Sequence, residues 1–240
     1  MSKGYEKNVY LAMLAEQCNR FEEMISFLEE MLSGRKEDLN SDERNLLSIA
    51  YKNAVSTRRS ALRTVMAYEM KEKKKENSSF LPYIQEYRKK IEDELTKMCE
   101  KVISTIDTHL VGRAADAEAR VFYYKMRGDY NRYVAEYAQG DLKKKVSDAS
   151  LKSYDDAIKS GETLSAVNPI LIGLYLNYSV FHYEVMNDHE KACVIAKEAL
   201  DKAEKELPAD EDDEACRDAI SIVSLLRENL EMWRNEAEDN

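Results

Sequence analysis

The sequence contains little glycine and proline, with 7 and 3 of them among 240 residues. The many tight turns of an all-β or mixed α/β fold require more of both. Hydrophobic residues make up 44% of the chain, which is enough for a core, so the 34% of charged residues predict a long solvated helical surface. No Gly/Ser-rich or Pro-rich linker divides the chain. The composition therefore predicts an all-α fold in a single domain.

Excess positive charge, clustered cysteines and long hydrophobic runs are absent as well. The net charge of −10 argues against a nucleic-acid surface. The four cysteines are scattered singly, which predicts reduced thiols and neither a zinc site nor a redox motif. The longest apolar stretch, 164–181, is interrupted by polar residues and a proline, and the N-terminus has no apolar signal core. We expect a cytoplasmic protein, with the nucleus as a second location, that neither crosses nor binds a membrane.

Start and stop signals divide the chain into about nine helices. Three asparagines are predicted to cap helix starts, two of them with a glutamate three residues later and one next to a proline: Asn40 with Glu43, Asn187 with Glu190, and Asn168 with Pro169. Predicted stops lie at Gly34, Gly112, Gly140, Gly161 and Leu207-Pro208. The helical domain is expected to span 1–234, followed by a short acidic tail at 235–240.

Repeats and enzyme motifs are also missing. Residues 175–206 resemble one tetratricopeptide unit, but the pattern does not recur about 34 residues away. The acidic run 210–214 lacks the ligand spacing and central glycine of a calcium loop. There is no phosphate-binding glycine loop, dinucleotide fingerprint, nucleophile elbow or zinc-protease motif, and His109, His182 and His189 stand apart from any nucleophile pattern. We therefore expect no enzyme, no metal site and no cofactor.

The segment 45–68 stands out by its charge. The chain has 46 acids in 240 residues, so 24 residues should hold about five; this segment holds none, and it carries four cations. On a helix turning by about 100° per residue, Lys52, Arg59 and Arg63 share one stripe, whereas Arg58 lies one step away from it. These cations either pair with acids from other helices or form an anion site.

A second helical segment, 121–133, contains donors suited to a phosphate. Lys125, Asp129 and Arg132 share a face, and Tyr133 adjoins it. The planar fork of an arginine and a tyrosine hydroxyl can both donate to a phosphate dianion. Asp129 could orient the arginine.

Two further helices carry an asparagine among apolar residues. Asn177 is followed by Val180 and Glu184 at helical spacing, and Asn229 lies on a stripe with Leu225 and Trp233. An asparagine amide can both donate to and accept from an extended peptide backbone. The alternative for each asparagine is a structural amide that caps a neighbouring helix.

Several of these segments together resemble a known family. Residues 44–53, RNLLSIAYKN, are similar to the first signature of the 14-3-3 proteins. Further matching segments run through nearly the whole chain: 14–17 (LAEQ), 121–123 (VFY), 128–130 (GDY), 132–133 (RY), 177–181 (NYSVF), and 225–230 (LLRENL) with Trp233. The resemblance implies a cup of nine antiparallel helices that dimerises through its N-terminal helices and binds phosphoserine or phosphothreonine peptides in an amphipathic groove.

The resemblance also implies roles for individual residues. The phosphate would be held by Lys52, Arg59, Arg132 and Tyr133, with Arg63 and Lys125 nearby. The peptide backbone would be held by Asn177 and Asn229, assisted by Glu184 and Trp233, along an apolar wall of Leu176, Val180, Leu225 and Met232. The dimer interface would pair Arg20 with Glu94 and Glu23 with Lys90, and would include Tyr87. Two departures concern Met232, where leucine is usual, and Ala61, where the family often has a second serine.

These observations predict a non-enzymatic dimeric adaptor whose partners are phosphorylated client proteins or peptides. The dimer would consist of two copies of this chain, or of this chain and a sister isoform. The alternative is a tetratricopeptide-like co-chaperone that binds acidic peptides regardless of phosphate.

Overall fold

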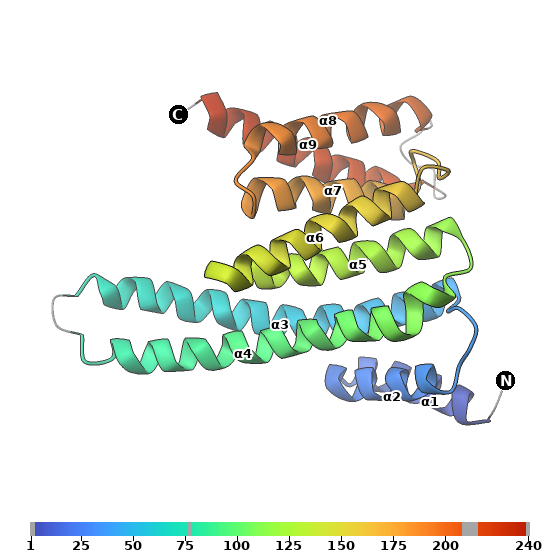
Figure 1. Cartoon of the computed structure of the whole chain (residues 1–240), viewed down its shortest axis with the longest axis horizontal. Coiled ribbons are helices and arrows are strands. Elements are labelled where there is room, and N and C mark those ends of the chain that lie inside the picture. Colours follow the sequence, from blue (N-terminus) through green and yellow to red (C-terminus); the bar gives the residue numbers. More distant parts are fainter. Residues whose placement is uncertain (1–2, 76–77, 208–215, 239–240) are drawn as a thin grey trace. The chain divides into compact units, whose positions relative to one another are not determined.

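The predicted all-α fold is confirmed. The computed structural model describes residues 3–75, 78–207 and 216–238, and within these ranges it contains nine α-helices and no strand (Figure 1). The helices are α1 (Lys3–Gln17), α2 (Phe21–Ser33), α3 (Ser41–Lys73), α4 (Leu81–Thr105), α5 (Ala117–Ala135), α6 (Gly140–Ser160), α7 (Pro169–Glu184), α8 (His189–Glu206) and α9 (Arg217–Glu238). A π-helical turn, Ile106–Leu110, and a 3-10 turn, Val111–Arg113, follow α4. None of the described helices has the length and apolar character needed to cross a lipid bilayer.

The chain folds into two compact units, Met1–Arg113 and Ala114–Asn240. Helices α1 to α4 belong to the first unit and α5 to α9 to the second. The predicted single domain over 1–234 spans both units and stays a prediction. The acidic tail was expected to begin at residue 235, but α9 continues to Glu238, so most of that segment is helical.

Two of the three predicted helix starts are confirmed. The Asn40 side chain accepts a hydrogen bond from the Glu43 amide, and Glu43 accepts one from the Asn40 amide, each at 2.9 Å. Asn168 caps α7, whose first residue is Pro169. The start predicted at Asn187 is wrong by one residue: Asp188 is the cap and accepts from the Lys191 amide at 3.1 Å. Asn187 has φ 53°, a left-handed conformation that is unsuitable for a helix N-cap.

The predicted glycine stops have mixed outcomes. Gly34 and Gly161 do end α2 and α6, but with φ of −96° and −93°, so positive φ is not the reason. At Gly161 the reason is packing, because a Cβ there would lie 2.8 Å from Leu171 Cδ1. The stop predicted at Gly140 is wrong, since this residue begins α6 with φ +57°. Gly112 lies in the 3-10 turn after α4, and α8 ends at Glu206 as predicted. Pro208 and the acidic run 210–214 lie outside the described residues.

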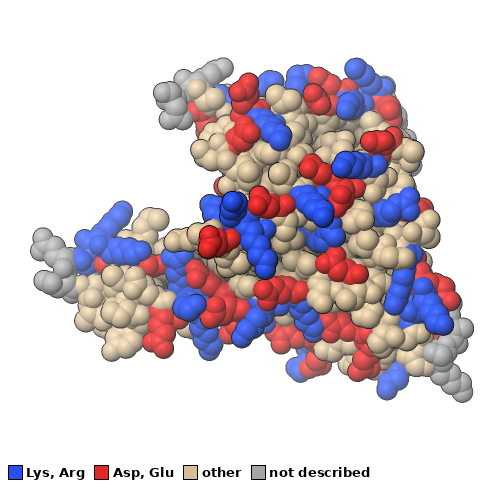
Figure 2. All heavy atoms as spheres, viewed as in Figure 1, with Lys and Arg blue, Asp and Glu red and all other residues tan. Residues whose placement is uncertain are grey.

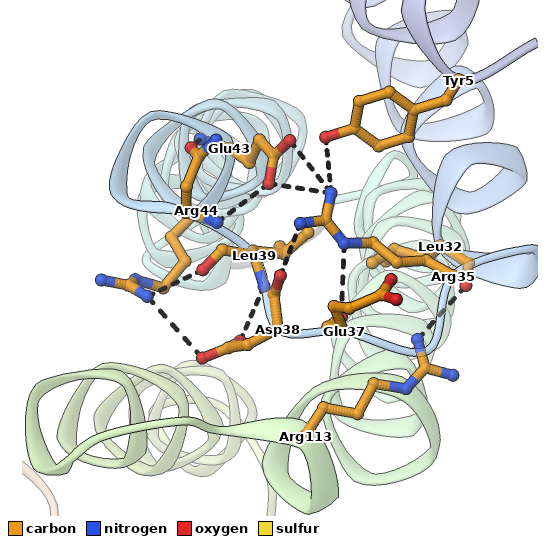
Figure 3. Close-up of polar contacts among 10 residues, drawn as sticks. Tyr5, Leu32, Arg35, Glu37, Asp38, Leu39, Glu43, Arg44 and Arg113 are labelled. Atoms are coloured by element: carbon orange, nitrogen blue, oxygen red, sulfur yellow. Dashed lines mark hydrogen bonds and ion pairs between the residues drawn. The ribbon is translucent and has the colours of Figure 1, made fainter. Parts of the chain in front are cut away.

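A polar cluster fixes the start of α3, the helix that carries the predicted cation stripe (Figure 3). Arg35, in the turn after α2, donates to Glu43 at 3.0 Å and also to the Tyr5 hydroxyl. Arg44 donates to the Leu39 carbonyl at 2.9 Å and lies 3.8 Å from the Asp38 carboxylate. Glu43 and Arg44 are both buried, so this network satisfies charges that would otherwise be costly. The first turn of α3 is thereby held against the α2–α3 loop.

A buried carboxylate joins α3 to α4 at the other end of this long helix pair. Glu69 is 4% exposed and accepts from Lys73 at 2.7 Å and from Arg88 of α4 at 2.8 Å. Hydrogen bonds from Lys73 and Arg88 lower the pKa of Glu69 to about 2. Glu69 therefore remains ionised at neutral pH, and its ion pair with Arg88 links α3 to α4.

The second unit has a core built from α7, α8 and α9. Small residues of α8, among them Ala192, Ala196 and Ala203, pack against Leu226 and Leu230 of α9 and Ile172 of α7. Trp233 is 4% exposed and stacks on Tyr183, with ring centroids 4.6 Å apart. The small side chains let the three helices pack closely around one apolar centre.

His182, near the end of α7, is a buried histidine without a polar partner in the described residues. Its side chain is 2% exposed, and neither ring nitrogen has a hydrogen-bond partner among the described residues. Burial, with a further contribution from Lys191, lowers the pKa of His182 to about 4. An unfolded chain would bind a proton there at about pH 6.5, so stability should fall as the pH drops from that value towards 4.

We expect His182→Phe to remove this pH dependence. Between pH 7.5 and 5.5 the unmodified protein should lose about 1 kcal/mol more of its unfolding free energy than His182→Phe. Urea denaturation at both pH values measures the difference, and both values lie above the isoelectric point of about 5.1. Parallel pH profiles for the two proteins would show that His182 does not resist protonation in the fold.

Candidate functional site

The predicted cation stripe lies on one unbroken helix. Lys52, Arg59 and Arg63 all belong to α3, so the assumed helical spacing applies. Lys52 and Arg63 are exposed, and within the described part of the chain neither side chain forms a hydrogen bond or ion pair. Figure 2 shows acidic and basic side chains interspersed over the viewed face, whereas these two cations have no acidic partner in the described residues. Arg59 is half-buried.

The neighbouring Arg58 behaves differently. It lies 2.5 Å from Glu22 of α2, and it donates to the Ala54 carbonyl at 2.9 Å. Pairing with an acid from another helix was the structural alternative for all four cations. The structure bears it out for Arg58, which lies off the predicted stripe.

The predicted donors of α5 surround one buried carboxylate. Asp129 is 6% exposed, and its oxygens accept from Lys125 at 2.9 Å and from the Tyr154 hydroxyl at 2.6 Å. The Asn177 amide of α7 donates to the same carboxylate at 2.8 Å. Arg132 lies 3.8 Å from it. We call these five residues the Asp129 cluster.

The charges of the Asp129 cluster are mutually stabilising. Burial by itself would raise the pKa of Asp129, but Lys125, Arg132 and the hydrogen bond from Tyr154 hold the pKa below its ordinary value. The carboxylate therefore stays ionised at neutral pH. Lys125 and Arg132 carry two positive charges against the one negative charge of Asp129, and Glu136 balances the second, because it also pairs with Arg132.

Arg132 is held on several sides. Its side chain is 8% exposed, its Nε donates to Tyr154 at 3.3 Å, and one terminal nitrogen donates to Glu136 at 3.2 Å. Its guanidinium lies 4.7 Å from the centre of the Tyr133 ring. The structure thus brings together Lys125, Arg132 and Tyr133, as the helical spacing predicted.

The two predicted asparagines differ in their surroundings. Asn177 is half-buried and uses its amide nitrogen on Asp129, so it does not cap a helix; its carbonyl oxygen makes no hydrogen bond with any described residue. Asn229, on α9, is half-buried, and its side chain forms no hydrogen bond within the described ranges. Both amides therefore retain groups that a peptide backbone could use.

The predicted apolar wall is partly exposed. Leu225 and Met232 of α9 are each 48% exposed, while Leu176 and Val180 of α7 are half-buried and pack on the core of the second unit. Glu184 is exposed at the end of α7. Trp233, in contrast, lies inside the core, so its indole supports the wall from within.

Sequence reasoning missed Tyr154 and Gly128. Tyr154 lies on α6 among Ser150, Ser153 and Ala157, a pattern that predicts only a buried helix face. No spacing rule connects it to Asp129, which is 25 residues away and on another helix. Gly128, the glycine of the GDY segment, was a possible signal, because a glycine inside a helix often marks a place where a side chain of a neighbouring helix packs closely against the backbone.

The predicted interface residues of the first unit lie at its surface. Arg20 and Glu23 pair with each other, and both are exposed. Tyr87 is 57% exposed, and Lys90 and Glu94 are exposed on the same helix. Helix α1 also exposes Tyr10, Met13 and Leu14.

We expect Asp129→Ala to destabilise the protein by about 3–5 kcal/mol, because it leaves Lys125 without its ion-pair partner and removes one of the two carboxylates beside the buried Arg132. Asp156→Ala is a matched control: Asp156 is 31% exposed and pairs with Arg127 of α5 at 3.0 Å, so its loss should cost about 1 kcal/mol. Chemical unfolding measures both. Equal losses would mean that the Asp129 cluster does not depend on its carboxylate.

Comparisons with known proteins agree with the motifs. Residues 11–234 match the family model described as 14-3-3 protein. A 14-3-3 protein homolog of Trichoderma harzianum is 46% identical over 237 residues, which cover 98% of this chain and 90% of that protein. The 14-3-3 protein 7 of Solanum lycopersicum is 43% identical, covering 100% of this chain and 94% of its own. Proteins of this family are non-enzymatic adaptors. The chain belongs to the 14-3-3 family.

Proposed function

We propose that this protein binds phosphoserine- or phosphothreonine-containing segments of its client proteins. The observation that carries the proposal is the cation stripe of α3, where Lys52 and Arg63 are exposed and lack acidic partners among the described residues of an otherwise acidic chain. Membership of the 14-3-3 family supports the adaptor role. Membership of this family also argues against a tetratricopeptide-like co-chaperone, while the dependence of binding on phosphate is part of the proposal.

The phosphate would be held by groups from two helices. The family resemblance assigns this role to Lys52 and Arg59 of α3 and to Arg132 and Tyr133 of α5, which would supply three positive charges and one hydroxyl for a dianion of about −1.5 to −2 charges. Arg63 and Lys125 would add further positive charge. Lys125 and Arg132 already share Asp129, so their ammonium and guanidinium groups are oriented before a ligand arrives.

The peptide on either side of the phosphate would lie against α7 and α9. The carbonyl of Asn177 and the amide of Asn229 suit the backbone groups of an extended segment. Leu176, Val180, Leu225 and Met232 would contact its side chains, while Glu184 and Trp233 would assist. Methionine at 232 is more flexible than the leucine usual in the family, which suits a broader range of peptides.

The protein would act as a dimer. Arg20 would pair with Glu94 of the partner subunit, and Glu23 with Lys90 of the partner subunit. The exposed Tyr10, Leu14 and Tyr87 supply apolar area that such an interface would cover. Two sites in one dimer would bind a doubly phosphorylated client with increased effective affinity. A heterodimer with a sister isoform would use the same surface, and residence in the cytoplasm stays a prediction.

We expect Lys52→Glu to reduce affinity for a phosphopeptide severely. It removes a cation and introduces an anion that faces the phosphate, a loss of about 2–5 kcal/mol or roughly 30- to several-thousand-fold. Calorimetric titration of one serine peptide in phosphorylated and plain forms measures it.

Arg58→Glu is the matched control for this experiment. Arg58 is on the same helix and is paired with Glu22, so its reversal should affect peptide affinity much less. If the unmodified protein binds both peptide forms equally, or if the two variants behave alike, the phosphate proposal fails.

We expect charge reversals at the interface to be mutually compensating. Glu23→Lys or Lys90→Glu alone should raise the dimer dissociation constant, because each weakens the free energy of dimerisation by up to about 1 kcal/mol for each of the two symmetric pairs. The double variant Glu23→Lys/Lys90→Glu should restore the constant of the unmodified protein. Sedimentation on dilution measures the constant. Lys89→Glu is the control, because Lys89 is exposed one residue away and pairs with Asp93 of its own helix. A monomer throughout the micromolar range would refute the dimer.

A further inference from the structure

A buried tyrosine of the Asp129 cluster contacts both the Asp129 carboxylate and the Arg132 guanidinium. Tyr154 of α6 is fully buried, and its hydroxyl donates to Asp129 at 2.6 Å while accepting from Arg132 Nε at 3.3 Å. A hydroxyl has a single proton, so donation to the carboxylate leaves its lone pairs for the guanidinium. The three groups form a directed chain from Arg132 through Tyr154 to Asp129.

The ring of Tyr154 is placed by packing. A Cβ at position 128 would lie 2.7 Å from Tyr154 Cε1 and 2.8 Å from its Cδ1, so only glycine leaves room for the ring against α5. Tyr178 and Phe181 of α7 contact the ring from the other direction, with centroids 5.4 and 5.7 Å away. Ser150 donates to the Gly128 carbonyl at 2.9 Å and ties the same turn of α5 to α6. Packing on both sides of the ring therefore fixes the position of the Tyr154 hydroxyl.

The hydroxyl also keeps its proton. Burial raises the pKa of Tyr154 well above 10, and the neighbouring Asp129 carboxylate raises it further. Tyr154 consequently remains a neutral donor and acceptor throughout the physiological range.

Contact through Nε determines what Arg132 can still bind. The Nε proton is used on Tyr154, one Nη1 proton is used on Glu136, and Nη2 lies near Asp129. A guanidinium has five N–H donors, so each terminal nitrogen keeps a proton that these contacts do not require. An arginine fixed through Nε can thus offer its two terminal nitrogens together, which is the geometry of bidentate phosphate recognition.

We propose that Tyr154, seated against Gly128, is a positioning residue for phosphate recognition: its hydroxyl holds the Arg132 guanidinium in the orientation that accepts a phosphate. This inference rests on the proposed function. Tyr154 is buried beneath Arg132 and acts through it. Fixing the guanidinium before binding removes an ordering cost that the ligand would otherwise bear.

The central test compares two Tyr→Phe variants. Tyr154→Phe keeps the ring and removes the hydroxyl. Tyr178→Phe makes the same change in the adjacent ring, which is 6% exposed and whose hydroxyl bonds to Asp155 at 3.3 Å, away from Arg132. We expect Tyr154→Phe to lower affinity for a phosphoserine peptide about tenfold and Tyr178→Phe to change it less than twofold. Thermal unfolding checks that both variants fold.

A spectroscopic measurement separates positioning from general stability without any ligand. The side-chain Nε–H signal of Arg132 in a ¹H–¹⁵N spectrum is assigned by its absence in Arg132→Lys. It should persist in the unmodified protein and in Tyr178→Phe, and should broaden or exchange away in Tyr154→Phe. In the Arg132→Lys background, Tyr154→Phe should cause no further loss of peptide affinity, because lysine has no Nε–H that the hydroxyl could hold.

Gly128→Ala provides a second route to the same result. It keeps every polar group but displaces the Tyr154 ring, so it should also weaken the Arg132 signal and the peptide affinity. An unchanged Arg132 signal in Tyr154→Phe, or equal affinity losses in the two Tyr→Phe variants, would overturn the positioning role alone. If the unmodified protein does not distinguish phosphorylated from plain peptide, the proposed function fails and the role of Tyr154 fails with it.

Discussion

A buried carboxylate organises the second unit. Asp129 is 6% exposed, and an ionised carboxylate at such a depth is tolerated only with opposite charges and hydrogen bonds around it. Lys125 and Arg132 supply the charge, while Tyr154 of α6 and Asn177 of α7 supply neutral donors. The need to satisfy one anion therefore ties α5 to two other helices. The same contacts orient the cationic and amide groups proposed to hold a ligand.

The first unit satisfies its buried charges in other places and leaves part of its stripe unpaired. Glu43 and Arg44 are neutralised in the α2–α3 turn, and Glu69 takes Lys73 and Arg88 at the far end of α3. Between these fixed ends, Lys52 and Arg63 have no acidic partner among the residues described. Buried ion pairs thus anchor both ends of α3, while two exposed cations between them remain without an acidic partner in the described residues.

Features carried by one helix could be predicted from the sequence, whereas features joining distant helices could not. Helical spacing was sufficient to group Lys125, Asp129 and Arg132, and the capping box at Asn40 was readable because both partners lie within one turn. The roles of Tyr154 and of the core-facing Trp233 depend on tertiary packing that spacing does not encode. The wrong predictions at Asn187 and Gly140 have a local cause, because both residues take positive φ next to the start of a helix. Asn187 therefore precedes the N-cap of α8 and is not the cap itself, and Gly140 begins α6 and does not end a helix.

Residues that contact a ligand and residues that hold them in place differ in how well they are satisfied. A group that contacts a ligand must keep an unused donor or acceptor; among the residues proposed for this role, Lys52, Asn229 and the carbonyl of Asn177 keep one within the described chain. A group that positions another must itself be immobile, so it should be buried and bonded on each side, as the hydroxyl of Tyr154 is. The two classes therefore differ in exposure as well: Lys52 is exposed and has no side-chain partner among the described residues, whereas Tyr154 is buried and bonded to both Arg132 and Asp129.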